Sequence, residues 1–428
     1  RQSWCPAAHI DRVFVSFRGC AFNPGRRSYH TSSSTSTSME IVRAVSDTFW
    51  STRVWLPPNI TWEDIRPGVR ADVNHADYRH LIYPIPLAAV IIVLRWIIER
   101  YWIAPVGKAL GIKSTGPKPP KPNKVLEAAY NVNARLSHKT TMRLMKQVDL
   151  SERQIEYWWR RRRAQDKPTT LVKFCETSWR CIYYTYSFIF GSIVMWDKPW
   201  LWDIKQCWYG YPHQSVTNDI WWYYMISMAF YWSLTASQFY DVKRKDFWQM
   251  FAHHMITILL MALSWVCNLH RVGSLVLLVH DCADIFLESA KLTKYAQYQK
   301  VCDTIFAIFT VVWIVTRLML YPRIIYSSSV EAPQILPMFP AYYIFNTLLI
   351  LLLVLHICWT YLIVQIAVKA IKSGQMEGDV RSSSSEEISD SSENSRPVLT
   401  NGGTPKKQPS KNGTTTANSV SASPKKKQ

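Results

Sequence analysis

The chain alternates between long apolar stretches and polar, charged segments. The first apolar stretch runs from Leu81 to Ile98 and contains one charge, Arg95, whose long side chain can reach the headgroup region. Six more follow a polar segment at 104–173, each near the roughly 20 residues that a membrane helix needs, with Trp and Tyr at their ends. Their approximate limits are Phe174–Trp196, Ile220–Tyr240, Phe247–Val266, Val272–Ala290, Val301–Tyr321 and Tyr342–Val368. The pattern predicts an all-α polytopic membrane protein with about seven transmembrane helices.

The Lys and Arg residues between these stretches predict the topology. The loop at 104–173 holds 16 of them, the next loop holds only Lys198 and Lys205, and basic-rich and basic-poor loops continue to alternate. Because cytosolic loops carry the excess of Lys and Arg, this alternation predicts an exoplasmic N-terminus and a cytosolic C-terminus. The sequon Asn59-Ile60-Thr61 would then be lumenal, which makes Asn59 a candidate glycosylation site.

The two ends of the chain differ in composition from the apolar part. Residues 1–38 are rich in Arg and Ser, which is typical of an organelle transit peptide or of translated sequence upstream of a start at Met39. The end of the chain is rich in Ser and acids, then in Lys, Pro and Thr, and is predicted to be disordered. There Ser383 and Ser384 each precede a Glu by three residues, a pattern that an acidophilic kinase could phosphorylate. The alternative is that this tail is only solvated.

These observations predict a division into segments. The segments are an extension (1–38), a lumenal segment (39–80), a first transmembrane helix (81–103), a basic Pro-rich linker (104–124), a small helical insert (125–167), a membrane domain with six transmembrane helices (168–372) and a cytosolic tail (373–428).

Composition and charge narrow the class of protein. The 428 residues include 50 Lys and Arg against 30 Asp and Glu, a formal charge of +20, and their 20 Trp, 22 Tyr and 16 Phe exclude wholesale disorder. Nine Cys without a C-x-x-C pair exclude a zinc ribbon, a thioredoxin site and a disulfide-dense scaffold. The basic excess suits nucleic acid or an anionic membrane surface, and +11 of it lies in residues 104–173.

The insert at 125–167 has apolar positions at helical spacing and predicts two helices joined by a turn. Its segment SERQIEYWWRRRRAQ resembles the recognition helix of a homeodomain, but the stretch is too short for the usual first helix, and Arg161 stands where that family has an adenine-reading Asn. Losing that Asn removes about 1–3 kcal/mol of base discrimination, so DNA binding is disfavoured and the arginines could equally grip lipid headgroups. The residues that would contact nucleic acid are Trp158, Arg160, Arg161, Arg162 and Arg163.

Ionisable side chains interrupt two neighbouring apolar stretches. His253 and His254 lie within Phe247–Val266, and at 100° per residue the polar side chains of the next stretch share one helix face. Those side chains are His280, Asp281, Asp284, Glu288 and Lys291. His253 lies seven residues from Asp246 and Asp284 lies seven from Lys291, so both are about 10 Å below the same surface and can meet. Charged groups at this depth are costly and point to function, the alternative being a polar network that ties two helices together.

Two kinds of chemistry fit this cluster. Two His and two Asp could bind a metal, but adjacent residues on a helix point about 100° apart, which disfavours joint chelation by His253 and His254. We therefore expect no metal and no resident cofactor. Acyl transfer fits better, because an imidazole can act as base or nucleophile while a carboxylate orients it. The sequence has no G-x-S-x-G elbow and no paired Cys nucleophile.

The residues of this region resemble the signature of ceramide synthases, which belong to the TRAM-LAG1-CLN8 family of membrane domains. The matching runs are H-H (253–254), S-W-x-x-N-x-x-R-x-G-x-L (264–275) and H-D-x-x-D-x-x-L-E-x-A-K (280–291), with further resemblance in FWSTRVWLPPNITW (49–62), KFCETSWR (173–180) and the acidic Ser tail. The resemblance implies that 168–372 is the catalytic domain, and that the protein N-acylates a sphingoid base with a fatty acyl-CoA as co-substrate in the endoplasmic reticulum membrane. We also expect that this chain can pair with a second copy or with another chain, as a homo- or hetero-dimer.

We expect His253 to attack the thioester and His254 to take a proton from the sphingoid amine, with Asp281 and Asp284 orienting the imidazoles. Supporting roles are expected for His280, Asn268, Arg271, Glu288 and Lys291. By resemblance, acyl-chain length is tuned in the loop between the last two spans, near Pro322–Pro340. The alternatives are a non-enzymatic lipid sensor or regulator of the same fold and a membrane-tethered DNA-binding regulator.

Overall fold

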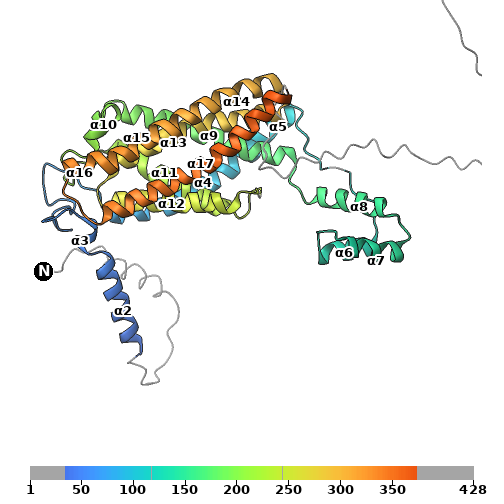
Figure 1. The fold of residues 1–428 in the computed structure, drawn as a ribbon, viewed down its shortest axis with the longest axis horizontal. Helices are drawn as coiled ribbons and strands as arrows, with labels where there is room; N and C mark the ends of the chain where they lie inside the picture. Colours follow the sequence, from blue (N-terminus) through green and yellow to red (C-terminus); the bar gives the residue numbers. More distant parts are fainter. Residues whose placement is uncertain (1–33, 117, 243, 374–428) are drawn as a thin grey trace, which may run out of the picture. The chain divides into compact units, whose positions relative to one another are not determined.

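The computed structural model describes residues 34–116, 118–242 and 244–373 (Figure 1). The hypotheses for residues 1–33 and for the tail, including Ser383 and Ser384, fall outside these residues. Within them the chain forms helices and no strand, which confirms the all-α prediction. The first short elements are α2 (Ser34–Phe49), α3 (Thr52–Trp55) and η1 (Tyr78–Ile82), and two more, α10 (Pro199–Trp202) and η3 (Ile204–Cys207), follow α9.

Each predicted apolar stretch contains a long helix. The helices are α4 (Pro84–Ile98), α9 (Thr170–Met195), α11 (Asn218–Ser237), α12 (Phe247–Val266), α13 (His270–Tyr295), α14 (Gln299–Trp313) and α17 (Ala341–Ser373). α13 packs against both α9 and α14, and α4 packs against α11. α13 is therefore a central helix, which brings its polar face into the interior of the bundle.

The described residues contain four segments with the length and apolar composition of a membrane span: Tyr78–Ala109, Phe247–Val266, Gln299–Ile335 and Ala341–Lys372. The other three long helices, α9, α11 and α13, have at least 20 residues each, but their polar and ionisable side chains reduce their hydropathy. The chain is thus a multi-pass membrane protein, and the number of seven crossings stays a prediction.

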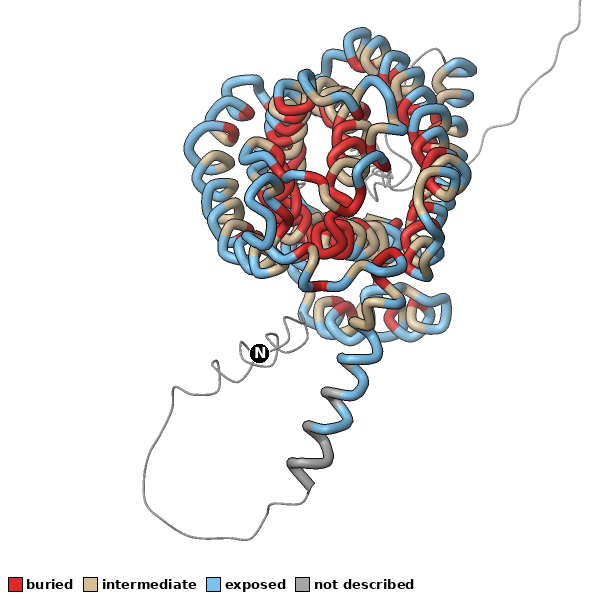
Figure 2. Tube along the Cα trace, turned by 90° about the vertical axis from the view of Figure 1, so that its left-hand side faces the viewer, coloured by how far each residue is buried: buried red, intermediate tan, exposed pale blue. Residues whose placement is uncertain are grey.

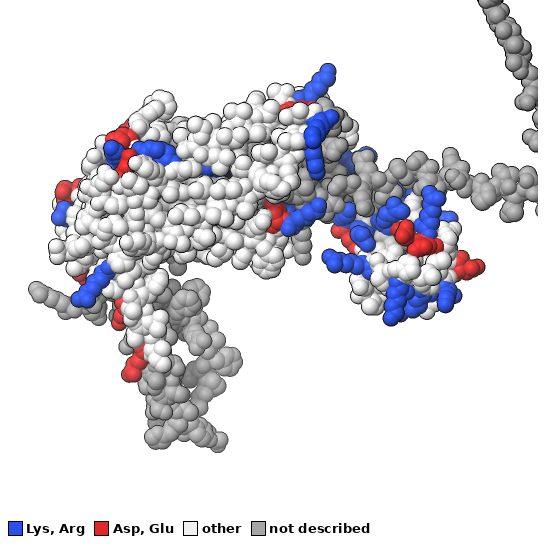
Figure 3. Space-filling view, in the orientation of Figure 1, with Lys and Arg blue, Asp and Glu red and all other residues white. Residues whose placement is uncertain are grey.

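Burial in the bundle is inverted relative to a water-soluble protein. Large apolar side chains point outward, for example Ile193 (70% exposed) on α9 and Ile371 (82% exposed) on α17. Ionisable side chains such as His280 and Arg317 are buried between the helices. Figure 2 shows the buried positions on the inward sides of the helices, and Figure 3 shows a middle part almost free of charge on that face. Lipid tails accept such a surface, whereas water would not.

Two predicted helix ends are wrong because the helices continue through proline. The stretch Pro322–Pro340, expected to be a loop, is helical as far as Ile335. A wide π-helical turn precedes each proline, and the proline occupies the first turn of the next segment, where its missing N–H is tolerated. The same arrangement extends α4 beyond Ile98. The turns are η2 (Glu99–Ile103), η4 (Ile314–Leu320) and η5 (Ser327–Glu331), and the segments after them are α5 (Ala104–Ala109), α15 (Tyr321–Tyr326) and α16 (Ala332–Ile335).

The insert contains three helices rather than the expected two: α6 (Lys124–Val132), α7 (His138–Val148) and α8 (Glu152–Gln165). Nine residues suffice for α6 because Asn123 caps its first turn and Leu126 is fully buried in a small core with Ile155. α8 begins with a capping box formed by Ser151 and Gln154. The insert therefore has a hydrophobic core of its own.

Candidate active site

A cavity of about 140 Å³ lies among α9, α11, α12, α13, α14, η4 and α17. His253, His254 and Asp284 all line it, as do Glu288 and Lys291. Further lining side chains come from helices outside the sequence signature, and include Arg180, Tyr184, Tyr231, Gln238, Arg317, His356 and Trp359. The structure thus brings both histidines to one cavity with an aspartate from the neighbouring helix.

His253 is surrounded by aromatic rings. Its ring centroid lies 5.3 Å from that of Trp359, edge to face, and 6.3 Å from that of Tyr231. The Nδ1 atom of His253 is buried and has no hydrogen-bond partner. The imidazole is therefore fixed by packing and keeps a ring nitrogen open toward the cavity side chains.

His254 is fixed by a hydrogen bond from an adjacent helix. Its Nδ1 lies 3.1 Å from Oε1 of Gln238, whose own Nε2 donates to the carbonyl of Phe247 over 2.6 Å. Because that second bond sets the orientation of the amide, Oε1 must accept and Nδ1 of His254 must donate. Nε2 is then the basic nitrogen. The orienting partner that the structure gives His254 is thus Gln238, not Asp281.

The two aspartates have different surroundings. Asp281 is buried, accepts a hydrogen bond from Oγ of Ser187 on α9 over 2.6 Å, and lies outside the cavity lining. Asp284 lines the cavity and pairs with Arg317 over 3.3 Å. Arg317 also donates to the carbonyls of Val279 and His280. The guanidinium therefore holds Asp284 and the backbone of α13 together, and Asp281 supports α13 through α9.

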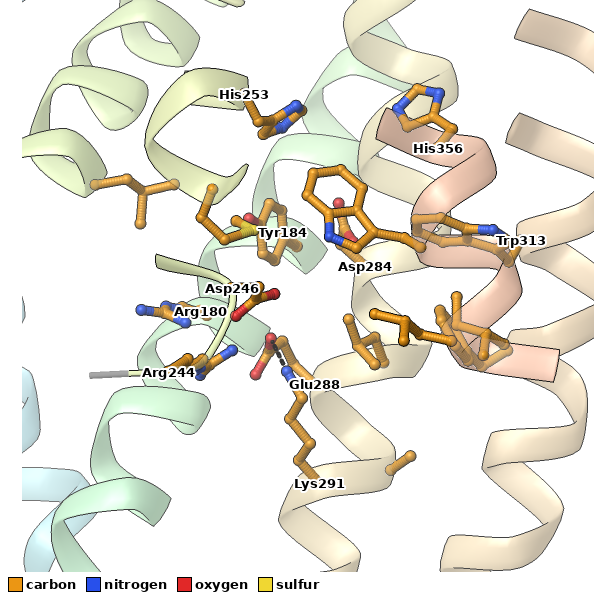
Figure 4. Close-up of a pocket in the computed structure, with 18 of the residues that line it drawn as sticks. Arg180, Tyr184, Arg244, Asp246, His253, Asp284, Glu288, Lys291, Trp313 and His356 are labelled. Carbon is orange, nitrogen blue, oxygen red and sulfur yellow. Dashed lines mark hydrogen bonds and ion pairs between the residues drawn. The ribbon is translucent and has the colours of Figure 1, made fainter. Parts of the chain in front are cut away.

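The other end of the cavity is charged (Figure 4). Glu288 and Lys291 are buried and form an ion pair at 2.7 Å. Arg180 and Arg244 both bind the buried carboxylate of Glu176, and Arg180 also reaches Asp241 over 3.3 Å. Figure 4 shows these cations and Glu288 on one side of Asp284 and the two imidazoles of His253 and His356 on the other. The cavity thus has a charged end and an aromatic, histidine-lined end.

Asn268 and Arg271, expected to support the histidines, lie at the opposite end of α12. Asn268 has φ +58°, donates to the carbonyls of Pro212 and Gln214, and accepts from the N–H of Ala76. Arg271 donates to the carbonyl of Gln206. Fifteen residues of helix separate Asn268 from His253, about 22 Å. These two residues hold loops onto the corner between α12 and α13 and do not contact the site.

The rest of that motif has the same structural purpose. Trp265 donates to the carbonyl of Asp77, and Ser264 hydrogen-bonds to the phenol of Tyr224. A side chain at Gly273 would collide with that phenol, since a Cβ there would lie 2.9 Å from Cζ of Tyr224. The glycine is required by this close approach of α11 and α13.

His280 faces a second, smaller cavity of about 90 Å³, whose lining is mostly apolar. Nδ1 of His280 donates to the carbonyl of Val276 over 2.6 Å, and its ring lies 5.0 Å from that of His356. Tyr231 lines both cavities. His280, His356 and Tyr231 thus stand between a polar cavity and an apolar one.

The sequence interpretation missed several residues of the site. The sequence does carry a signal for Arg317 and His356, since each is an ionisable residue inside an apolar stretch. Gln238 ends a Trp- and Tyr-rich stretch, Ser187 lies among small polar residues, and Trp359 resembles any other aromatic residue of the belt. Nothing in the sequence alone assigns those three to the cavity.

Most of the insert residues that were expected to contact nucleic acid instead contact other residues of the insert. Trp158 is buried and donates to the carbonyl of Lys121. Arg162 pairs with Glu127 and Asp166, and Arg163 donates to the carbonyl of Ala134. Arg161 stacks on Tyr157 and Arg160 is exposed.

The ion pairs of the insert also involve a buried phenol. Tyr130 donates to Asp166 over 2.7 Å. Burial and this hydrogen bond raise the pKa of Tyr130 to about 12, and the same bond, with help from Arg162, lowers the pKa of Asp166. These groups hold α6 and α8 together and leave Arg160 as an outward-facing cation.

Two further predicted features can be placed. Asn59 is exposed and adopts φ +65° in a turn, so its side chain is accessible. Among residues 34–116, 118–242 and 244–373, no group of three or more His, Cys, Asp or Glu side chains is arranged to hold a metal ion.

The sequence matches known families over most of its length. Residues 173–365 match the TLC domain family and residues 120–168 match the homeodomain family. Ceramide synthase 5 of Homo sapiens is 43% identical over 343 residues, which cover 79% of this chain and 87% of that protein. Ceramide synthase 4 of Bos taurus is 39% identical over 79% of this chain and 86% of its own, and ceramide synthase 3 of Mus musculus is 39% identical over 78% and 87%. This chain belongs to the ceramide synthase family.

Proposed function

We propose that this protein transfers a fatty acyl group from acyl-CoA to the amine of a sphingoid base, giving a ceramide or dihydroceramide. The observation that carries the proposal is the cavity in which two adjacent histidines face a paired aspartate inside membrane helices. Both substrates have long hydrocarbon chains, so a site within the bilayer lets those chains stay out of water. The small apolar cavity that His280 lines lies next to this site, since Tyr231 lines both.

In the first step, a ring nitrogen of His253 attacks the thioester carbonyl carbon. The carbon–sulfur bond breaks, the coenzyme A thiolate leaves and takes the proton of the other ring nitrogen, and a neutral acyl-imidazole remains. The aromatic packing around His253 holds the ring in position. The coenzyme is proposed to enter at the charged end of the cavity, where Arg180, Arg244 and Lys291 are each paired with a carboxylate.

In the second step, the sphingoid amine attacks the acyl carbon. An ammonium group is not nucleophilic, so a base must first remove a proton. Nε2 of His254 is available for this, because Gln238 holds the proton of the ring on Nδ1. The new carbon–nitrogen bond forms, the amine gives its second proton to the departing ring, the bond to His253 breaks, and the neutral imidazole returns. His254 then releases its proton to water. The ion pair between Asp284 and Arg317 holds α13 in place beside the helix that carries the histidines.

The location of the site favours an orientation in the membrane. His253 is the seventh residue of α12, about 10 Å from the surface next to Arg244 and Asp246. Acyl-CoA is a cytosolic anion, so this surface is proposed to be cytosolic, with the N-terminus in the lumen of the endoplasmic reticulum. The loop at 104–173, with +11 of the net charge, would face the same side.

The proposal is tested with microsomes that express this chain, incubated with sphinganine and acyl-CoAs of increasing chain length. We expect N-acylated sphinganine with at least one acyl-CoA and loss of at least about 100-fold with His253→Ala. Arg160→Ala, an exposed position of the insert, is the matched control and should keep full activity. If no chain length gives product, the lipid-sensor hypothesis replaces the enzyme.

A further inference from the structure

The acyl transfer proposed above passes through two tetrahedral intermediates that carry a negative oxygen. When His253 attacks the thioester, the carbonyl electrons move onto oxygen, and the same happens when the amine attacks the acyl-imidazole. In a water-poor cavity this oxyanion needs hydrogen-bond donors that are already in place. The question is which side chains of the cavity have donors to spare.

Two of the cavity side chains hold unused donors close to the histidines. Nε1 of Trp359 and Nε of Arg317 are buried and have no hydrogen-bond partner. An indole N–H and a guanidinium N–H can only donate, so a carbonyl or an oxyanion can satisfy them, whereas an ammonium group cannot. Leaving such a group unsatisfied in the interior costs about 1–3 kcal/mol, which suggests that the partner is a ligand.

Trp359 contacts His253 directly, and Arg317 is linked to it through the rings of Trp313, His356 and Trp359. The Trp359 ring lies edge to face with His253 at 5.3 Å and at 6.3 Å from His356. Arg317 stacks over Trp313 at 5.1 Å, and Trp313 lies 6.1 Å from His356. Both Trp359 (6% exposed) and Arg317 (3% exposed) line the cavity.

A third donor of the same kind belongs to the charged end of the cavity. Nε of Arg180 is also buried without a partner, but the rest of its guanidinium is occupied by Glu176 and Asp241. Figure 4 places Arg180 beside Arg244, away from His253. Arg180 therefore belongs to the ion pairs at the charged end of the cavity and not to the surroundings of the reacting carbonyl.

We propose that Trp359 Nε1–H and Arg317 Nε–H form the oxyanion site of this enzyme, binding the carbonyl oxygen of the acyl group in both half-reactions. This inference rests on the proposed acyltransferase function. Arg317 would then serve two purposes: its terminal nitrogens hold Asp284 and the α13 backbone, and its unpaired Nε–H donates to the acyl oxygen.

The test replaces Trp359 by Phe, which keeps an aromatic ring and removes the N–H. Removing one oxyanion donor typically lowers kcat by about 100-fold or more, so W359F should lose about that factor with KM changed less than about threefold. Acyl-enzyme formation and its discharge by sphinganine, followed separately by intact mass, should both slow, because the oxyanion forms in both steps.

Trp200 provides the matched control. Its Nε1 is likewise buried without a partner, but Trp200 lies in α10 under Arg271, at the far end of the bundle. W200F should keep the wild-type kcat. Trp359→Met is the second variant, in case Phe leaves a gap that prevents folding; its flexible side chain has no hydrogen-bond donor and should show the same loss.

Three results would overturn the inference while the proposed function stands: W359F or W359M with kcat within about threefold of an active wild type, a loss matched by W200F, or slowing of the second half-reaction only. A wild type without activity on any acyl-CoA would instead refute the proposed function.

Discussion

Gln238 shows how one residue outside the signature determines the chemistry of a residue within it. Its Oε1 accepts from Nδ1 of His254, and this leaves Nε2 of His254 as the base. The arrangement matches an orienting carboxylate in function, but an amide adds no charge at this depth in the membrane.

Replacing Gln238 by Leu should therefore lower kcat by about 10- to 100-fold, because the imidazole loses the partner that fixes its tautomer and position. KM for the acyl-CoA should stay unchanged, since the coenzyme contacts the charged end. Steady-state kinetics in microsomes, corrected for the amount of protein, measure both constants. An unchanged kcat would show that Gln238 is only a packing residue.

The site could be predicted from the sequence only in part. His253, His254 and Asp284 stand out because ionisable residues in apolar stretches are costly, and helical spacing places them at one depth. Asn268 and Arg271 belong to the same motif but secure a corner about 22 Å away, because a motif records residues needed for packing as well as for chemistry. Trp359 and Gln238 come from other helices, and only the packing of those helices assigns them to the cavity.

The corner between α12 and α13 is an element defined by close packing. The phenol of Tyr224 occupies the space where a side chain at Gly273 would be, and it hydrogen-bonds to Ser264. The corner sets the angle between the helices that carry the histidines and the aspartates.

A single added methyl group should disturb the corner between α12 and α13. Gly273→Ala should destabilise the protein by about 1–3 kcal/mol, since the added Cβ overlaps Tyr224. Tyr224→Phe removes the closest atom, so the double variant should recover part of that loss. Thermal unfolding of the detergent-purified variants measures the cycle, and strict additivity of the two substitutions would contradict the proposed collision.

Two loops beside this corner meet through a pair of histidines. Nε2 of His75 lies 3.2 Å from Nδ1 of His213, and Asn74 pairs with Val216 through its backbone. Burial lowers the pKa of both imidazoles, and repulsion between their charged forms adds to the effect at His75. Arg70 disfavours the charged forms further, whereas the carboxylates of Asp64 and Asp72 oppose it.

The depressed pKa values make this contact acid-sensitive. Its contribution to stability is complete above the ordinary histidine pKa of 6.5 and is lost as pH falls below that value, because the unfolded chain binds protons more readily. Amide exchange at 72–76 and 212–216, corrected for intrinsic rates, should therefore accelerate below pH 6.5. His213→Gln should weaken this pH dependence, because it removes one of the two buried imidazoles and its repulsion on His75, and an unchanged dependence would assign it elsewhere.

Helix positions followed from the apolar pattern, but several helix ends did not. Proline at 105, 322 and 333 would ordinarily end a helix, yet a π-helical turn before each one lets the helix continue. The short α6 was missed because nine residues show little periodicity, and its stability comes from the cap at Asn123 and from burial of Leu126.

For the molecule as a whole, charge and exposure agree with a multi-pass membrane protein. The outward side chains of α9 and α17 are apolar, and +11 of the formal +20 lies in the loop at 104–173. The proposed orientation makes a separate prediction at Asn59, which is exposed in the segment before α4.

If that segment is lumenal, Asn59 in the sequon with Thr61 should carry an N-glycan. The protein expressed in cells should then migrate faster on a gel after endoglycosidase treatment, and Asn59→Gln should remove the difference. A wild-type band that the enzyme does not shift would contradict a lumenal, accessible Asn59.

The central claim is that this cavity transfers acyl groups through His253. The most direct measurement is the intact mass of the purified protein after incubation with an acyl-CoA and no sphingoid base. The account predicts a species heavier by one acyl group, absent in His253→Ala and discharged when sphinganine is added. No adduct in the wild type, or an adduct that persists in His253→Ala, would contradict it.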